Sequence, residues 1–230
     1  MSATLCAKCK KHEVKSHTLT KLDGSDFLVT DTICPACRKE DDRNKKRQAR
    51  EGVCKALLDA GVPFCGVGAS EAEIVTLLQG WAAAFKSGRD GWFLYGAAGG
   101  YKTRALCFAC ETIALAGGPV ATWINCPFML VQYTAAAAGV EGSTAQILAR
   151  MSGAKILVVD DWGKGVLTPR GLELIYAVVN RRYERRLPTL YTSNKPLEWL
   201  AKWVRADDCD YVGAIIRRIR ETCKIVEVPA

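Results

Sequence analysis

The feature that most constrains the fold of this chain is a glycine-rich segment placed between an apolar run and a helix-forming stretch. Residues 96–103 read Gly-Ala-Ala-Gly-Gly-Tyr-Lys-Thr and directly follow the apolar residues 92–95. A strand, a glycine-rich turn, Lys-Thr and a helix, in that order, predict a phosphate-binding loop, in which backbone N–H groups and a helix N-terminus face an anion. Lys102 would then reach the outer phosphates of a nucleotide, and Thr103 would hold a magnesium ion. A glycine-rich turn with an incidental Lys-Thr is the alternative interpretation.

Tyr101 departs from this loop pattern, which places a glycine immediately before the lysine. Glycine lets the backbone pass close to phosphates without a Cβ and adopts positive φ angles freely. A tyrosine held at a positive φ would cost about 1–2 kcal/mol. We expect this cost to weaken a nucleotide site without abolishing it.

A second apolar run, further along the chain, ends in two carboxylates. Residues 155–161 read Lys-Ile-Leu-Val-Val-Asp-Asp, which is typical of a buried central strand of a parallel sheet. Open α/β sheets bind ligands at the carboxyl ends of such strands. Asp160 is therefore expected to bind magnesium through water, and Asp161 to polarise the attacking water. Two adjacent aspartates alone would also fit an ordinary strand and turn, but the upstream loop favours nucleotide binding.

Two later segments end in side chains suited to phosphate chemistry. Residues 187–194 predict a short apolar strand that ends in Asn194, whose amide could orient a water or sense a γ-phosphate. Residues 215–220 read Ile-Ile-Arg-Arg-Ile-Arg and predict a helix with arginines beside an apolar face. An arginine offered to the nucleotide of a neighbouring subunit would stabilise charge on the transferring phosphoryl group. An ordinary turn and a solvated basic helix face are the respective alternatives.

Taken together and in this order, these segments resemble the DnaC/IstB-like branch of the AAA+ ATPases. That branch contains replicative helicase loaders of bacterial or phage type and the ATP-dependent regulators of some transposases. The similarity covers residues 50–224. It implies an α/β fold of the P-loop AAA+ type, with a parallel sheet flanked by helices, and ATP and Mg²⁺ as cofactors.

The resemblance also assigns roles to single positions of this sequence. The loop glycines, together with Lys102 and Thr103, would bind the nucleotide. Asp160 and Asp161 would be the acidic pair at the end of the second apolar strand, and Asn194 would be the sensor. The arginine finger would be Arg218, with Arg217 as the alternative. The nucleotide-binding positions in the loop are Gly96, Gly99, Gly100, Lys102 and Thr103.

The first forty residues carry an independent metal-ligand pattern. Two Cys-x-x-Cys pairs flank a segment that alternates enough to form a hairpin around Asp23-Gly24. Four thiolates complete a tetrahedral zinc shell and leave no open position for a substrate, so the pattern predicts a structural zinc ribbon. A disulfide framework and a redox motif are the alternatives, and His12 and His17 are expected to be spectators. The predicted ligands are Cys6, Cys9, Cys34 and Cys37.

The predicted organisation is a zinc-ribbon module (1–40), a charged linker helix (41–55) and an AAA+ P-loop ATPase domain (56–230). Both ends of the chain are basic: residues 1–55 hold thirteen Lys and Arg against eight Asp and Glu, and residues 181–224 hold eleven against six. Such surfaces suit contact with phosphate backbones, although solubility alone would also explain them.

The chain shows no membrane or export signal that would change this interpretation. Residues 112–140 are uncharged, but glycines and prolines interrupt them, and a spanning helix needs about 20 consecutive apolar residues. The segment instead predicts part of a β-α-β-α arrangement, and the chain start lacks an apolar signal core. We therefore expect a cytoplasmic protein without a membrane partner.

The favoured function is an ATPase, weak because of Tyr101, that helps to place a replicative helicase on DNA during replication initiation. The resemblance implies that the zinc module docks on the helicase, that single-stranded DNA is a second partner, and that subunits associate through the arginine finger. One alternative is an IstB-like regulator of transposition. The other is a zinc-containing DNA or protein adaptor on a scaffold that does not hydrolyse ATP.

Overall fold

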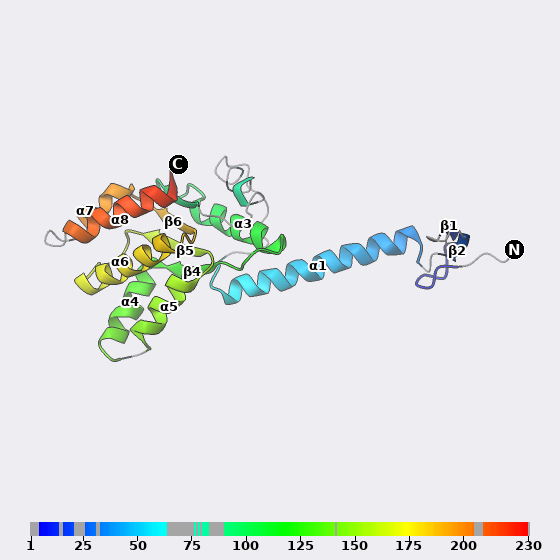
Figure 1. Ribbon diagram of the computed structural model, residues 1–230, viewed down its shortest axis with the longest axis horizontal. Helices are drawn as coiled ribbons and strands as arrows, with labels where there is room; N and C mark the ends of the chain where they lie inside the picture. The colour runs from blue at the N-terminus through cyan, green and yellow to red at the C-terminus, as the bar shows by residue number, and fades with distance from the viewer. Residues whose placement is uncertain are drawn as a thin grey trace. The chain divides into compact units, whose positions relative to one another are not determined.

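The computed structural model describes residues 5–13, 16–20, 26–30, 33–63, 76, 78, 80–82, 90–140, 142–204 and 209–229, with the backbone alone for 16–20, 26–30, 209 and 210. Two compact units, Met1–Gly52 and Val53–Ala230, make up the chain. Figure 1 shows the elements of each unit in chain order.

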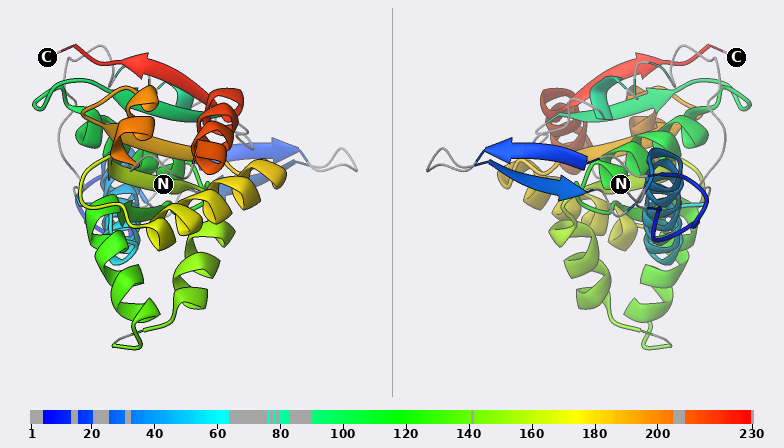
Figure 2. Two further views of the ribbon diagram at one scale, coloured as in Figure 1. Left: turned by 90° about the vertical axis from the view of Figure 1, so that its left-hand side faces the viewer. Right: turned by 90° about the vertical axis from the view of Figure 1, so that its right-hand side faces the viewer.

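Five parallel strands form the centre of the second unit. They lie in the order β4-β5-β6-β3-β7, and every neighbouring pair is parallel. Figure 2 shows β7 at one edge of this sheet. The strands are β3 (Gly91–Tyr95), β4 (Thr122–Asn125), β5 (Leu157–Trp162), β6 (Thr189–Ser193) and β7 (Cys223–Glu227).

Helices cover both faces of the sheet, which explains why β3, β5 and β6 read as almost continuous apolar runs. The arrangement confirms the predicted α/β fold with a parallel sheet flanked by helices. The helices around this sheet whose bounds the structure describes are α3 (Lys102–Leu115), α4 (Cys126–Ala137), α5 (Thr144–Gly153), α6 (Pro169–Glu184), the 3₁₀ turn η1 (Leu197–Trp199), α7 (Leu200–Trp203) and α8 (Cys209–Thr222).

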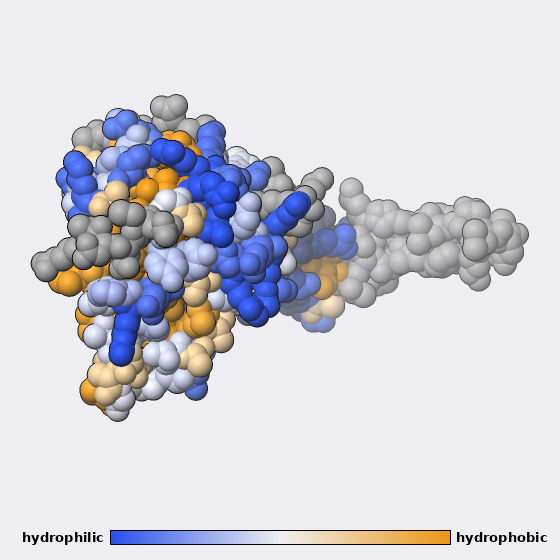
Figure 3. Space-filling view, turned by 60° about the vertical axis from the view of Figure 1, so that its left-hand side comes forward, coloured by the Kyte–Doolittle hydropathy of each residue, from blue (hydrophilic) through white to orange (hydrophobic). Residues whose placement is uncertain are grey.

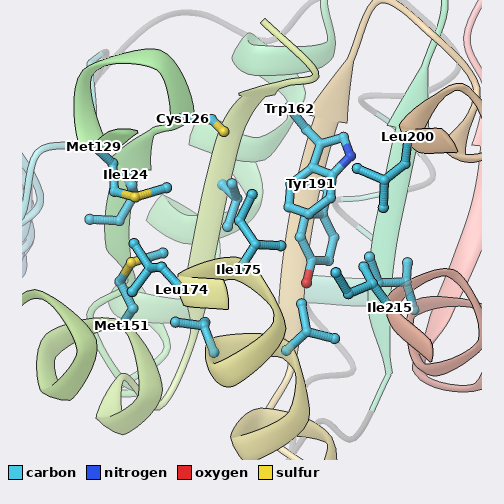
Figure 4. Close-up of a cluster of buried hydrophobic side chains, with 14 of the residues drawn as sticks. Ile124, Cys126, Met129, Met151, Trp162, Leu174, Ile175, Tyr191, Leu200 and Ile215 are labelled. Atoms are coloured by element: carbon cyan, nitrogen blue, oxygen red, sulfur yellow. The ribbon is translucent and has the colours of Figure 1, made fainter. Parts of the chain in front are cut away.

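Among the described residues of the second unit, the core forms two apolar clusters, one on each face of the sheet. Side chains of β3 alternate between them: Trp92 and Leu94 pack with α3, and Phe93 packs on the opposite face with residues of α6 and α8. Figure 4 shows this second cluster, in which Tyr191 of β6 lies between Trp162 and Ile215. Both faces of the loop-bearing strand are therefore held rigidly.

Capping residues explain where two of these helices begin. The Asn125 side chain accepts a hydrogen bond from the Phe128 N–H (3.2 Å) at the start of α4, and Thr168 accepts one from the Gly171 N–H (3.1 Å) at the start of α6. A strand followed directly by a helix is part of the β-α-β-α arrangement predicted for this segment. Figure 3 shows hydrophobic side chains in the region of α4 and α5, where Val131 of α4 and Val140 of the connection between the two helices are exposed.

The first unit contains an antiparallel hairpin and most of a long helix. Strands β1 (Ser16–Thr20) and β2 (Asp26–Thr30) pair with Ser16 opposite Thr30, which confirms the predicted hairpin strands. The expected turn at Asp23-Gly24 lies outside the described residues. Helix α1 (Pro35–Asp59) begins inside the segment predicted as zinc ribbon and runs through the segment predicted as linker, so the predicted boundaries at 40 and 55 remain predictions.

Within the described residues, no helix combines the length and the apolar character that crossing a membrane requires.

Candidate functional site

The glycine-rich loop lies between β3 and α3, as its sequence predicts. Its first residue, Gly96, donates its N–H to the carbonyl of Ser193 at the end of β6 (3.2 Å). Gly96 and Gly99 have φ angles of 146° and 92°, which favour glycine, and a Cβ on Gly99 would meet nothing within 4 Å. No side chain caps the first turn of α3, so its N–H groups can receive an anion.

Tyr101 has the strained backbone that its position in the loop predicts. It precedes α3 at φ 56° and ψ 11°, the left-handed region, and its side chain is half exposed. A residue with a Cβ in this region costs about 1–2 kcal/mol. The effect of this strain on nucleotide affinity stays a prediction.

Lys102 points back over the loop. Its Nζ donates hydrogen bonds to the carbonyls of Gly96 (3.0 Å) and Ala97 (2.6 Å), and the side chain is 7% exposed. Burial, followed by the positive charge of Lys164, lowers the pKa of Lys102, while the two aspartates oppose this shift. The ammonium group therefore lies where the loop would enclose a phosphate.

Asp160 joins three elements at the carboxyl edge of the sheet. Its Oδ1 accepts hydrogen bonds from Thr103 Oγ1 of α3 (2.9 Å) and from Thr192 Oγ1 of β6. Burial raises the pKa of Asp160, and the two hydroxyl donors partly offset that effect. The predicted pair Thr103 and Asp160 is thus brought together, as one magnesium ion would require.

Sequence reasoning missed Thr192. The available signal was a hydroxyl residue two positions before Asn194, and it was weak because the same strand also contains Thr189 and Ser193. Its importance depends on β6 lying next to β5, which the linear sequence does not state.

Asp161 lies at an irregularity in β5 and forms an ion pair that sequence reasoning did not anticipate. Its φ is 59°, and its N–H donates to Thr192 Oγ1 (3.0 Å). Its Oδ1 accepts a hydrogen bond from Lys164 Nζ (2.7 Å). The side chains of Asp161 and Lys164 are 32% and 46% exposed.

Asn194 lies at the same edge as the loop. Tyr95 of β3 and Ser193 of β6 are register partners, so Gly96 and Asn194 are the first residues beyond two neighbouring parallel strands. Asn194 is half-buried. The structure therefore gathers the loop, the two aspartates and Asn194 at one edge of the sheet.

The two candidate arginines lie apart from these residues, on α8. Arg217 is exposed and its Nε lies 3.9 Å from the Glu221 carboxylate. The Arg218 guanidinium lies over the rings of Tyr176 (5.3 Å) and Tyr183 (5.7 Å), both from α6. Within the described residues, neither arginine forms a hydrogen bond or ion pair with the loop or with either aspartate, and the buried Nε and Nη1 of Arg218 have no hydrogen-bond partner.

Val228 and Pro229 lie against the loop, a contact that the sequence does not indicate. The Val228 N–H donates to the Tyr95 carbonyl (2.7 Å). A Cβ built on Gly100 would lie 3.0 Å from the Pro229 carbonyl oxygen. These residues therefore cover the side of the loop that faces β7.

The four predicted zinc ligands converge in the first unit. Their sulfur atoms all lie within 4.8 Å of one another, and Cys6, Cys34 and Cys37 are buried. All four are free thiols, and the Cys34 N–H donates to Cys6 Sγ (3.2 Å). Sulfur ligands 2.3 Å from a tetrahedral zinc ion lie about 3.8 Å from one another, so the cluster fits zinc.

Of the two histidines near this cluster, the structure describes the side chain of His12 but not that of His17. His12 Nδ1 lies 3.3 Å from Cys9 Sγ, and this hydrogen bond is the main reason that the pKa of Cys9 is lowered to about 5. A thiolate is the form that binds metal. The side chain of His17 lies outside the described residues, and the spectator role of both histidines stays a prediction.

The chain is similar to known proteins both in sequence and in fold. The model of a family described as IstB-like ATP binding protein matches residues 64–230. A search of curated proteins found no match. The crystal structure of DnaI is 18% identical, with a TM-score of 0.61 over 70% of this chain and 88% of that one.

Two further solved structures share the fold. The crystal structure of the DnaC helicase loader is 18% identical, with a TM-score of 0.55 over 66% of this chain and 86% of that one. The structure of AMPPCP-bound DnaA from Aquifex aeolicus is 15% identical, with a TM-score of 0.55 over 70% of this chain and 48% of that one. These likenesses confirm the predicted P-loop AAA+ fold.

Proposed function

This chain belongs to the IstB-like ATP binding protein family, and from that premise we propose that it is an ATP-dependent loader that helps to place a replicative helicase on DNA. The observation that carries the nucleotide part of this proposal is the hydrogen bond from Thr103 to Asp160 (2.9 Å), beside the loop that Lys102 closes. This hydrogen bond joins the two side chains that would bind magnesium, of which the loop pattern predicts one and the acidic strand predicts the other.

The roles of the remaining residues follow from where each one lies. The loop N–H groups and Lys102 would hold the phosphates, and Thr103 and Asp160 would hold magnesium. Magnesium-bound ATP supplies a phosphoanhydride whose cleavage can drive a change between two subunit arrangements. Asp161 would accept a proton from water, and Asn194 would orient that water.

Self-association would complete the site, because neither Arg217 nor Arg218 reaches the loop of its own subunit by a hydrogen bond or ion pair among the described residues. Arg218 fits the role of an arginine finger better than Arg217. Its Nε and Nη1 lack a hydrogen-bond partner, whereas Arg217 lies near Glu221. Both Arg218 atoms are buried, so the side chain would have to leave the Tyr176 and Tyr183 rings to reach a neighbouring subunit. An arginine with unused donors can stabilise charge on a phosphoryl group.

The choice of a helicase as client rests on the structural neighbours, one of which is named as a helicase loader. The zinc module would dock on the helicase, and single-stranded DNA would bind the basic surfaces. The family description favours a second candidate, a regulator of transposition that uses the same ATPase domain. A loader is expected to bind a hexameric helicase, whereas a transposition regulator is expected to form ATP-dependent filaments on duplex DNA.

A titration with Mg²⁺ and a fluorescent ATP analogue tests the nucleotide part of the proposal. We expect Lys102→Ala to abolish binding, because it removes the cation that the loop encloses. Lys202→Ala, which changes an exposed lysine on α7, serves as the matched control and should leave binding unchanged. Equal binding by both variants would reject the ATPase, and the zinc-containing adaptor would then be the better interpretation.

A pull-down assay with candidate clients separates the two ATPase functions. The loader requires ATP-dependent retention of a replicative helicase, and this retention should decrease when Cys34 and Cys37 are changed to Ser. Retention of a transposase without any helicase would instead support the regulator of transposition.

A further inference from the structure

Lys164 is a second lysine at the edge of the sheet where the loop lies. It follows β5 in a tight turn, in which its N–H donates to the Asp161 carbonyl (3.2 Å). Gly163 and Gly165 have φ angles of 86° and 85°, so glycine on each side of Lys164 permits this turn. The turn directs the Lys164 side chain back to the Asp161 carboxylate, where Nζ lies 2.7 Å from Oδ1.

The positions of the charges link Lys164 to the phosphate loop. Asp161, the partner of Lys164, donates its N–H to Thr192 Oγ1 (3.0 Å), and Thr192 and Thr103 both donate to Asp160 Oδ1. This series of hydrogen bonds connects Lys164 to the first turn of α3, where Lys102 lies. Two cations and two carboxylates therefore share one edge, and an anion entering near Lys102 is attracted to both lysines.

The ion pair between Lys164 and Asp161 is weak enough for Lys164 to exchange Asp161 for another anion. Both side chains are partly exposed, at 46% and 32%, and ion pairs of this kind contribute little to stability. Two of the three ammonium donors of Lys102, in contrast, are occupied by the Gly96 and Ala97 carbonyls. A phosphate carries more negative charge than a carboxylate and offers three acceptor oxygens, so it competes well for the ammonium group of Lys164.

We propose that Lys164 exchanges Asp161 for the terminal phosphate of a bound nucleoside triphosphate, so that this side chain makes the site prefer a triphosphate over a diphosphate. The same exchange frees Asp161 Oδ1 at the moment when a water must be polarised. The inference rests on the proposed nucleotide site and adds a residue that the loop pattern does not contain.

Equilibrium binding of two nucleotides to the full chain tests the inference without relying on hydrolysis. Magnesium-bound ADP and a non-hydrolysable ATP analogue are titrated against the unaltered protein, Lys164→Ala, Lys164→Arg and the control Lys202→Ala. We expect Lys164→Ala to weaken binding of the ATP analogue about tenfold, as the loss of one charge-assisted hydrogen bond predicts, and to change ADP binding less than about twofold. Lys164→Arg should retain most of the preference, and Lys202→Ala should retain all of it.

The variant Asp161→Asn separates a phosphate contact from a merely structural ion pair. It leaves Lys164 in place but removes the charge that holds it, so the preference for the ATP analogue should be retained or increase. A loss of preference like that of Lys164→Ala would mean that the ion pair only maintains the turn.

The outcomes distinguish this inference from the proposed function. If Lys102→Ala abolishes binding while Lys164→Ala weakens both nucleotides equally or neither, the inference is wrong and the nucleotide site stands. If the unaltered protein binds neither nucleotide, the proposed function fails, and the role of Lys164 fails with it.

Discussion

The backbone of Gly96 passes so close to the carbonyl of Val228 that a Cβ on Gly96 would lie 2.1 Å from the Val228 oxygen. The first glycine of the loop is therefore required for packing as well as for its φ angle of 146°. The Val228 N–H, which donates to the Tyr95 carbonyl (2.7 Å), holds this contact in place. The phosphate loop is thus supported from the β7 side by residues more than a hundred positions away in sequence.

Gly96→Ala is expected to destabilise the second unit more than Gly99→Ala does. Both positions have a positive φ, which costs an alanine about 1 kcal/mol, but only Gly96 faces a backbone atom that must move, which adds about 1–3 kcal/mol. Urea denaturation of the two variants measures the difference. Equal losses in the free energy of unfolding would show that Val228 does not press on Gly96.

Replacing Tyr101 separates the strain of its backbone from the effect of its ring. At φ 56°, glycine is unstrained and alanine is not, so Tyr101→Gly should be about 1 kcal/mol more stable than Tyr101→Ala. Thermal or urea denaturation provides the comparison. The half-exposed ring is absent from both variants and so does not enter the difference. A Tyr101→Ala variant as stable as the glycine variant would mean that the loop relaxes away from the left-handed region.

Zinc content tests the cysteine cluster. We expect about one zinc ion per chain by elemental analysis, because four sulfur atoms within 4.8 Å of one another complete one tetrahedral shell. Changing Cys34 and Cys37 to Ser should remove the ion, whereas Cys54→Ser, on α1, and His12→Ala should retain it. Unaltered protein without zinc would contradict the assignment, and loss of zinc in His12→Ala would make His12 more than a spectator.

Arg182 should be far more important for stability than its neighbour Arg181. Arg182 is 2% exposed and donates hydrogen bonds to the Thr189 hydroxyl and to the carbonyls of Met151, Ala154 and Pro188. Arg182→Met would remove the donor to the Met151 and Ala154 carbonyls, while the Pro188 carbonyl keeps its hydrogen bond from the Leu157 N–H (3.3 Å), and is expected to cost about 3–5 kcal/mol. Arg181→Met, on the exposed side of the same helix, should cost less than about 0.5 kcal/mol.

The contribution of Arg182 to the free energy of unfolding should not depend on pH near neutrality. Burial lowers the pKa of Arg182 to about 10, so in the folded and unfolded states alike the group stays protonated below about pH 9. A lowered pKa on a cation means that stability would rise only as the pH passes about 10. Urea denaturation of the two methionine variants at pH 6 and pH 8 should therefore give the same difference, and a clear change between them would contradict the assignment of a fully charged buried arginine.

Much of the candidate site could be predicted because its signals are local. Lys102 and Thr103 follow directly from a strand, a glycine-rich turn and the start of a helix, and Asp160 and Asp161 follow from the end of an apolar strand. Thr192 and Lys164 were missed. Thr192 becomes important only because β6 lies beside β5, and Lys164 only because a turn at Gly163 brings it back to Asp161.

The amino-acid sequence by itself determined strands β3, β4, β5 and β6, the phosphate loop and the four cysteines, because strand periodicity, turn chemistry and ligand spacing act between residues close in the chain. The edge strand β7 was not predicted. Tertiary structure alone decided that Val228 lies against Gly96, that Arg182 is buried among carbonyls, and that Arg218 lies over the rings of two tyrosines. Those contacts depend on the order β4-β5-β6-β3-β7. That order results from burying both faces of the sheet at once, a cooperative property of the whole domain that no short segment contains.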